Sequence, residues 1–170
     1  MIKLIAAIDL NSSLGFENKL LTKLPNDMKH FKKLTTNGFV CMGRRTYDSI
    51  GHALPNRTNI ILTRNKKYKA PVGTFVYHSI EEVIEQYKNQ NNNESELYFI
   101  GGSEVYNQAL PYCDRIYLTI IQHTFPEVDT WFPRISLVDW KPIETVKNKA
   151  DDKNEHDHFF VTYERRNNQK

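Results

Sequence analysis

The chain has 170 residues, of which 39% are hydrophobic and 25% are charged. This length predicts one domain with a substantial core, over residues 1–170, and the composition excludes a disordered or fibrous protein. The net charge of +3 suits an anionic ligand, but lysine and arginine are spread along the chain, so we expect no nucleic-acid partner.

The N-terminal apolar run, MIKLIAAI, is too short to span a membrane and lacks the flanks of a secretory signal. Cys41 and Cys113 are far apart in the sequence and match no metal spacing, so we expect reduced thiols and no metal site. These features predict a cytoplasmic protein with no membrane partner. A monomer is expected because no long apolar patch is obvious.

Short β-branched or aromatic runs alternate with segments that have helical periodicity. The predicted strands are residues 2–8, 38–42, 59–63, 74–78, 96–101, 115–121 and 158–164. The predicted helices are residues 25–34, 45–50, 80–88 and 103–110. This order predicts a three-layer α/β fold with a mainly parallel sheet. The last two strands have no helix between them, which predicts an antiparallel pair at one edge. Residues 88–96 should form a polar loop, and the tail 165–170 should fray.

The first of these helices carries an acid on its apolar arc. With about 100° per residue, Asp27 falls on the same side as Met28, Phe31 and Leu34. An unpaired carboxylate facing a core is costly, so Asp27 needs a partner that the helix itself does not supply. The alternative is an acid favoured by the dipole of the first helical turn. That alternative explains the position of Asp27 along the helix but not its place on the arc.

Two glycine-containing junctions connect a strand to a helix. They are VCMGRRTYDSI, which contains Gly43, and YFIGGSEVY, which contains Gly101 and Gly102. Free N–H groups and close backbone approach at such junctions suit a polyanionic cofactor, and Arg44 and Arg64 together could clamp a phosphate. The alternative is that the glycines serve turns and the arginines are solvated, since neither junction has the full Gly-x-Gly-x-x-Gly pattern.

The order of the segments LIAAID, LGFENKLL, LPNDMKHFKKLT, VCMGRRTYDSIG, LPNRTNIILTR, FIGGSEVY, IYLTII and DTWFP resembles the dihydrofolate reductase family over about residues 1–166. The resemblance implies a mixed sheet of about eight strands with about four flanking helices and an antiparallel C-terminal hairpin at one edge. It also implies NADPH-dependent reduction of 7,8-dihydrofolate to 5,6,7,8-tetrahydrofolate, by hydride transfer to C6 and protonation of N5.

On the substrate side, the resemblance implies that Asp27 binds the paired N–H donors of the pterin and that Thr119 supports it. Tyr106 would help polarise the reacting region, with water as the proton source. Arg57 would grip the glutamate tail. The apolar pocket would be lined by Ile5, Ala7, Met28, Phe31, Ile50, Leu54 and Ile100. Each of these apolar residues is equally an ordinary core residue.

On the cofactor side, the resemblance places Thr63 and Arg64 at the 2′-phosphate, which would favour NADPH over NADH. It also implies a cis peptide between Gly101 and Gly102. Glu104 stands near a position that is often basic in the family. The cofactor residues implied are Ala6, Ala7, Leu14, Gly43, Arg44, Arg45, Thr46, Thr63, Arg64, His78, Gly101, Gly102, Ser103, Glu104 and Val105.

Residues 14–24 would form a lid, with Asp129 bonding its backbone near Gly15. Leu21 and Thr22 replace the family's Pro-Trp, which predicts weaker binding of dihydrofolate. Two other classes remain open: an NADPH reductase of a ribosylated pyrimidine, and a non-catalytic structural or interaction module of the same fold. Asp27 and Arg57 favour a folate over a pyrimidine.

Overall fold

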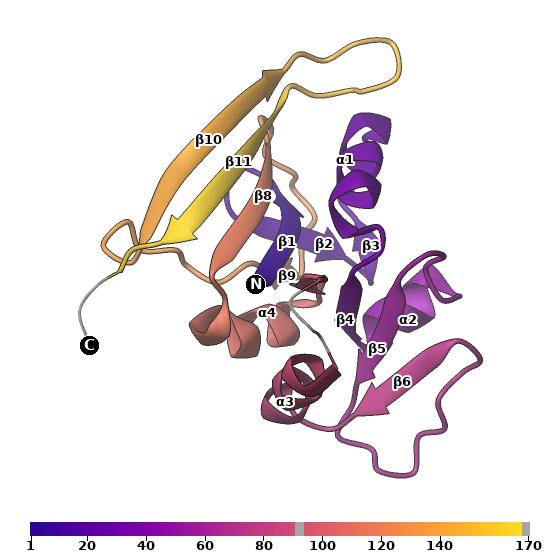
Figure 1. The fold of residues 1–170 in the computed structure, drawn as a ribbon. Coiled ribbons are helices and arrows are strands. Elements are labelled where there is room, and N and C mark those ends of the chain that lie inside the picture. Colours follow the sequence, from indigo (N-terminus) through magenta and orange to yellow (C-terminus); the bar gives the residue numbers. More distant parts are fainter. Residues whose placement is uncertain (91–93, 168–170) are drawn as a thin grey trace.

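A computed structural model describes residues 1–90 and 94–167, and strands and helices alternate along most of this length (Figure 1). The helices are α1 (Pro25–Thr35), α2 (Arg44–Ile50), α3 (Ile80–Gln90), α4 (Ser103–Ala109) and the short 3-10 helix η1 (Leu110–Tyr112). The strands are β1 (Ile2–Ile8), β2 (Ser13–Phe16), β3 (Lys19–Leu20), β4 (Phe39–Gly43), β5 (Thr58–Leu62), β6 (Thr74–Tyr77), β7 (Leu97–Phe99), β8 (Arg115–Ile121), β9 (Thr130–Trp131), β10 (Trp140–Asn148) and β11 (His158–Arg165).

In the described part of the chain, eight of these strands form one mixed sheet in the order β10-β11-β8-β1-β7-β4-β5-β6. Strands β1 and β4 to β8 pair in parallel, whereas β11 is antiparallel to both β8 and β10. A smaller sheet has the order β3-β2-β9. The mainly parallel sheet with an antiparallel C-terminal hairpin at one edge confirms the predicted fold class.

Helices cover the large sheet on both faces. Leu4 and Ala6 of β1 belong to one core cluster, which includes residues of α3 and α4. Ile5, which points to the other face, belongs to a second cluster that packs with Phe31 of α1 and Ile50 of α2. Successive strand residues alternate between faces, so a strand buried on both sides is apolar at nearly every position. This explains the continuous apolar runs in the sequence.

The prediction missed the edge strand. Residues 115–121 and 158–164 do pair antiparallel, but β11 lies inside the sheet and β10 forms the edge. Strand β10 is exposed at most positions and contains Pro142 beside an irregularity in its pairing. An edge strand of this kind needs no apolar run, so the hydrophobic pattern did not reveal it.

The predictions for the polar loop and the tail were partly wrong. Helix α3 continues to Gln90, and residues 91–93 of the predicted loop lie outside the described residues, as do residues 168–170 of the tail. Arg165 ends β11 and donates to the carbonyls of Cys113 and Leu110, so the tail is anchored at this point. Among the described residues, no helix has the length and hydropathy to cross a membrane.

Asp9 organises the chain directly after β1. Asp9 is 1% exposed, and its carboxylate accepts backbone N–H bonds from Asn11 at 2.9 Å, Ser13 at 2.8 Å and Phe125 at 3.1 Å. Burial by itself raises the pKa of Asp9, but the hydrogen bonds outweigh it and the pKa is lowered overall. Asp9 therefore joins the start of β2 to the segment after β8.

We expect Asp9→Asn to lower the free energy of unfolding by about 1–3 kcal/mol at pH 7, because the amide cannot replace both acceptor oxygens. A lowered folded-state pKa gives stability that is present above the unfolded pKa and lost as pH falls through the folded pKa. The difference between wild type and variant should therefore shrink below about pH 4. Urea unfolding at pH 7 and pH 3 measures it. The exposed Asp152→Asn serves as the matched control, and an unchanged free energy of unfolding at pH 7 would contradict this role for Asp9.

Candidate functional site

Asp27 lies in the first turn of α1, where Pro25 is compatible with the start of a helix. The Thr119 hydroxyl of β8 donates to Oδ1 of Asp27 at 2.6 Å. Burial raises the pKa of Asp27, while the bond from Thr119 and the nearby His30 and His158 act in the opposite direction. Within residues 1–90 and 94–167, Asp27 forms no ion pair, and its Oδ2 accepts no hydrogen bond. The carboxylate is thus held by one bond and keeps acceptor capacity for a ligand.

The residue before Asp27 is fixed by contacts that the sequence did not indicate. The backbone N–H of Asn26 donates to Oδ1 of Asn154 at 3.0 Å. The side-chain nitrogen of Asn26 lies 2.9 Å from Nε2 of His158, whose Nδ1 lies 2.9 Å from the carbonyl oxygen of His156. Asn154 and His158 are both buried. These bonds join the start of α1 to the β10–β11 connection and so help to set the position of Asp27.

A small cavity of about 20 Å³ lies beside Asp27. It is lined by Ala7, Leu14, Leu20, Leu21, Thr22, Leu24, Asp27 and Ile121. This volume is close to that needed for one water molecule. The predicted lid therefore contacts the space at Asp27, and Thr22 is part of its lining.

The structure brings together most of the predicted apolar pocket. Ile5 is buried, and Phe31, Ile50, Leu54 and Ile100 pack half-buried against the same core cluster. Met28 was wrong as a core residue, because its side chain is 58% exposed. It lies at the margin of the apolar arc of α1.

Arg57 is oriented by its surroundings. Its Nη1 donates to Oγ1 of Thr35 at 3.1 Å, its Nε donates to the carbonyl of Pro55 at 2.9 Å, and its guanidinium carbon lies 5.9 Å from the centre of the Phe31 ring. Asn59, buried in β5, bonds the backbone of Leu54 in both directions and the carbonyl of Arg57. Thr35 and Asn59 were not predicted from the sequence, although an asparagine inside a strand is a signal for such a role.

The two predicted glycine junctions meet in space. The N–H of Gly43 donates to the carbonyl of Gly101 at 2.8 Å. A Cβ atom at Gly102 would lie 3.6 Å from Oγ1 of Thr46, and one at Gly43 would lie 3.4 Å from Cγ2 of Val105. The peptide between Gly101 and Gly102 is cis, as the family resemblance implied. The ends of β4 and β7 thus form a narrow cradle without side chains of its own.

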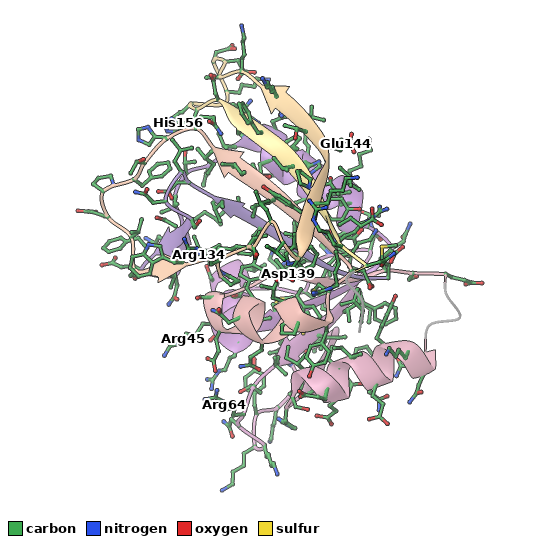
Figure 2. The ribbon with its side chains drawn as sticks, turned by 90° about the vertical axis from the view of Figure 1, so that its left-hand side faces the viewer. Arg45, Arg64, Arg134, Asp139, Glu144 and His156 are labelled. Carbon is green, nitrogen blue, oxygen red and sulfur yellow. The ribbon has the colours of Figure 1, made fainter. Side chains whose placement is uncertain are left out.

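Basic side chains surround this cradle, but two of them already have partners. Arg44 lies 3.8 Å from the Asp48 carboxylate and 4.9 Å from the Tyr68 ring centre. Arg64 pairs with Glu104, so the predicted clamp of Arg44 and Arg64 on one phosphate is not preformed. Arg45 is exposed, and Figure 2 shows it on the same side of the molecule as Arg64. Nδ1 of His78 lies 2.7 Å from the carbonyl oxygen of Thr63, which fixes the imidazole beside the end of β5.

The remaining predicted cofactor residues come from β1, β2 and α4. Ala6, Leu14 and Val105 pack in one cluster with Tyr106. The Tyr106 hydroxyl donates to the carbonyl of Ile5 at 2.7 Å, and burial, then the nearby charge of Asp27, raises its pKa, so it remains a protonated donor. The Ser103 hydroxyl donates to the carbonyl of Trp131 at 2.8 Å.

The predicted lid contains the short β2–β3 hairpin and is tied down by Asp129. The N–H of Asp129 donates to the carbonyl of Gly15 at 3.0 Å, and Oδ2 of Asp129 accepts from the N–H of Glu17 at 2.9 Å. This confirms the predicted contact between Asp129 and the lid backbone. At Gly15 itself a Cβ atom would lie 2.6 Å from the carbonyl oxygen of Lys19, so only glycine fits this hairpin.

Together these features form two adjoining parts. One presents a carboxylate beside an apolar wall and a partly buried arginine, which suits a flat heterocycle with paired donors and an acidic tail. The other presents a glycine cradle with exposed arginines, which suits a phosphate-containing cofactor. In the described residues, no group of three or more His, Cys, Asp or Glu side chains could hold a metal ion.

Comparisons with known proteins agree with this arrangement. Residues 1–165 match the sequence model of the dihydrofolate reductase family. The dihydrofolate reductase of Bacillus subtilis is 37% identical over 170 residues, which cover 100% of this chain and 98% of that protein. The dihydrofolate reductase of Staphylococcus haemolyticus is 37% identical over 164 residues, which cover 96% of this chain and 95% of that protein. The structure of dihydrofolate reductase from Enterococcus faecalis complexed with NADP(H) and RAB-propyl is similar with a TM-score of 0.89 and 40% identity, covering 97% of this chain and 96% of that one.

Proposed function

This chain belongs to the dihydrofolate reductase family, and we propose that the residues described above perform the family's reaction in the roles given below. The chain is an NADPH-dependent oxidoreductase that reduces 7,8-dihydrofolate to 5,6,7,8-tetrahydrofolate. The single observation that supports the assignment of the substrate site is the half-buried Asp27 carboxylate, which is held by Thr119 and has no cationic partner within the described residues.

Asp27 recognises the pterin through two acceptor oxygens. The pterin ring presents an N–H and an amino group side by side, and a carboxylate matches this pair. Thr119 donates to Oδ1 and so fixes the plane of the carboxylate. The apolar wall of Ile5, Phe31 and Ile100 excludes water, which strengthens the pair. Ala7, Met28, Ile50 and Leu54 complete the pocket, and Arg57 binds the glutamate tail of the substrate.

The cofactor fits the glycine cradle, because a Cβ at Gly43 or Gly102 would occupy space that the backbone leaves open. When bound, NADPH supplies the hydride that reaches C6 of dihydrofolate. Thr63, Arg64 and His78 would bind the 2′-phosphate. Tyr106, whose hydroxyl donates to the carbonyl of Ile5, would help polarise the region in which the hydride is transferred. The other residues that would line the cofactor site are Ala6, Ala7, Leu14, Gly43, Arg44, Arg45, Thr46, Gly101, Gly102, Ser103, Glu104 and Val105.

Proton delivery to N5 is assigned to water, because Asp27 binds the opposite side of the pterin ring. The lid controls the entry of that water, and its contacts with Asp129 hold it in place. The role of Asp27 is then to bind and orient the pterin, with Thr119 as its support.

Spectrophotometry tests these assignments. Loss of NADPH absorbance in the presence of dihydrofolate should be rapid, and an oxidised ribosylated pyrimidine should give no turnover. A folded protein that binds both molecules without turnover would be the non-catalytic module. Turnover of the pyrimidine alone would reassign the substrate pocket.

Thr22→Trp should tighten dihydrofolate binding. Thr22 lines the cavity beside Asp27, and an indole there would cover apolar surface of substrate and wall. Burial of about half of a large side chain corresponds to roughly a tenfold lower dissociation constant. Fluorescence titration measures it, and Thr22→Val controls for loss of the hydroxyl. An unchanged or higher dissociation constant in the tryptophan variant would count against this.

We also propose a single-domain monomer that acts on small molecules in the cytoplasm. The two buried cysteines form no disulfide, which fits a reducing compartment, and the small net charge gives little attraction to nucleic acid. Analytical ultracentrifugation tests the oligomeric state.

A further inference from the structure

An ion pair crosses the cofactor site. Nη2 of Arg64, two residues after the end of β5, donates to Oε1 of Glu104 in the first turn of α4. The two residues are 40 positions apart in the sequence. The same oxygen also accepts from Nε2 of Gln108 at 3.3 Å, one helical turn further along. The fold, and not the local sequence, brings this carboxylate to Arg64.

The pair is open to solvent. The Arg64 side chain is 84% exposed and the Glu104 side chain 66% exposed. Exposed ion pairs of this kind contribute little net free energy, so the pair connects the end of β5 to α4 only weakly. A ligand with a stronger charge can therefore replace the carboxylate on the guanidinium without a large penalty.

The position of the pair gives it a role in cofactor choice. Arg64 is assigned above to the 2′-phosphate, and Thr63 beside it is backed by His78. A phosphate that approaches Arg64 must displace Glu104 and then remain close to its negative charge. The ribose of NADH carries a 2′-hydroxyl there, and a carboxylate is the usual acceptor for that hydroxyl. Glu104 thus disfavours binding of the 2′-phosphate and favours binding of the 2′-hydroxyl.

We propose that Glu104 is a specificity-determining residue that weakens binding of the 2′-phosphate by competing for Arg64, and so narrows the preference of this enzyme for NADPH over NADH. The inference rests on the assignment of Arg64 to the 2′-phosphate. It differs from a purely structural role of the pair, in which Glu104 would matter equally for every adenine nucleotide.

Direct binding to the ligand-free enzyme tests this. Calorimetry with adenosine 2′,5′-bisphosphate and with 5′-AMP isolates the effect of the 2′-phosphate, and fluorescence titration gives the affinities for NADPH and NADH. We expect Glu104→Gln to tighten binding of the bisphosphate and NADPH by about 3- to 10-fold at low salt, with no tightening for 5′-AMP or NADH. The gain should shrink at 0.5 M salt, because screening weakens the repulsion.

Glu155→Gln is the matched control, since it removes the same charge from an exposed residue whose neighbour His156 lies at the opposite end of the molecule from Arg64 in Figure 2. It should leave all four affinities unchanged. Equal effects of Glu104→Gln on the phosphorylated and unphosphorylated ligands, or weaker binding of the bisphosphate, would overturn the proposal.

The Arg64→Leu variant tests separately whether Arg64 binds the 2′-phosphate, which the proposed competition by Glu104 requires. If that assignment holds, Arg64→Leu weakens bisphosphate binding by about 10- to 100-fold. If Arg64→Leu does not change bisphosphate binding, the assignment of Arg64 to the 2′-phosphate is wrong, and the proposed competition by Glu104 is rejected as well. If Arg64→Leu weakens binding and Glu104→Gln changes nothing, only the competition is rejected.

Discussion

Asp27→Asn should reduce kcat/KM for dihydrofolate by about 10²- to 10³-fold at pH 7. The amide has one acceptor oxygen, and Thr119 already uses one acceptor of the carboxylate. Its NH₂ group would face the donors of the pterin, and the negative charge that strengthens the pair would be lost. Steady-state loss of NADPH absorbance measures the change, and the exposed Asp139→Asn provides a matched control.

The effect of Asp27→Asn on kcat/KM should also depend on pH. Burial raises the pKa of Asp27, so the folded enzyme protonates this group at a higher pH than an exposed aspartate. As pH falls through that folded-state pKa, wild type loses the charge that the variant lacks at every pH. The ratio of wild-type to variant kcat/KM should therefore be largest near neutral pH and decrease in acid.

The free energy of unfolding of Asp27→Asn distinguishes a role of Asp27 in substrate binding from a role in stabilising the fold. Because the folded-state pKa is raised above the unfolded value, the charged Asp27 destabilises the fold above that pKa, and this cost disappears as pH falls through it. Asp27→Asn should thus leave the free energy of unfolding at pH 7 unchanged or higher. Full activity in this variant would falsify the assignment, and a loss of both activity and stability would make Asp27 a structural residue.

Arg57→Leu should raise KM for dihydrofolate by about 10- to 100-fold, with a smaller change in kcat. The guanidinium is fixed by its bonds to Thr35 and Pro55, and loss of the proposed charge-assisted pair with the glutamate carboxylate accounts for a change of this size. The tail lies far from the reacting atoms, so its contacts act mainly on binding. The KM of Arg57→Lys should lie between the values of wild type and Arg57→Leu, because lysine keeps the charge but loses the planar guanidinium.

A shortened substrate controls for damage to the turn that carries Arg57. A 6-methyl-dihydropterin has no glutamate, so wild type and Arg57→Leu should reduce it with similar KM values. Arg134→Leu, which removes an exposed arginine labelled in Figure 2, should leave both substrates unaffected. Equal losses for the long and short substrates would show that Arg57 acts through the fold of the pocket.

The sequence predicted those elements whose environment leaves a periodic pattern. Strands β1 and β4 are covered on both faces, so nearly all of their residues are apolar, and the runs were found with small errors at the ends. Strand β10 has only Trp140 fully buried, and β3 and β9 have two residues each, so none of them leaves a usable pattern.

For the site, a single helix was enough to single out Asp27, because its spacing from Phe31 and Leu34 depends only on helical geometry. The roles of most other residues came from the family resemblance. Thr35, Asn26 and Asp9 could not be found, since their partners lie in segments whose distance in space depends on the whole fold. The Arg64–Glu104 pair was missed for the same reason, although both residues had been placed in the cofactor site.

The position of β11 has a consequence for how the enzyme becomes active during synthesis. This last strand is inserted between β10 and β8, with Phe160 opposite Thr119, and Arg165 secures its end. Until residues 158–165 have left the ribosome, β8 has an open edge and the support of Asp27 is incomplete. A nascent chain that has finished every other element still lacks a competent pterin site, and a C-terminal truncation before His158 should yield an inactive, aggregation-prone product.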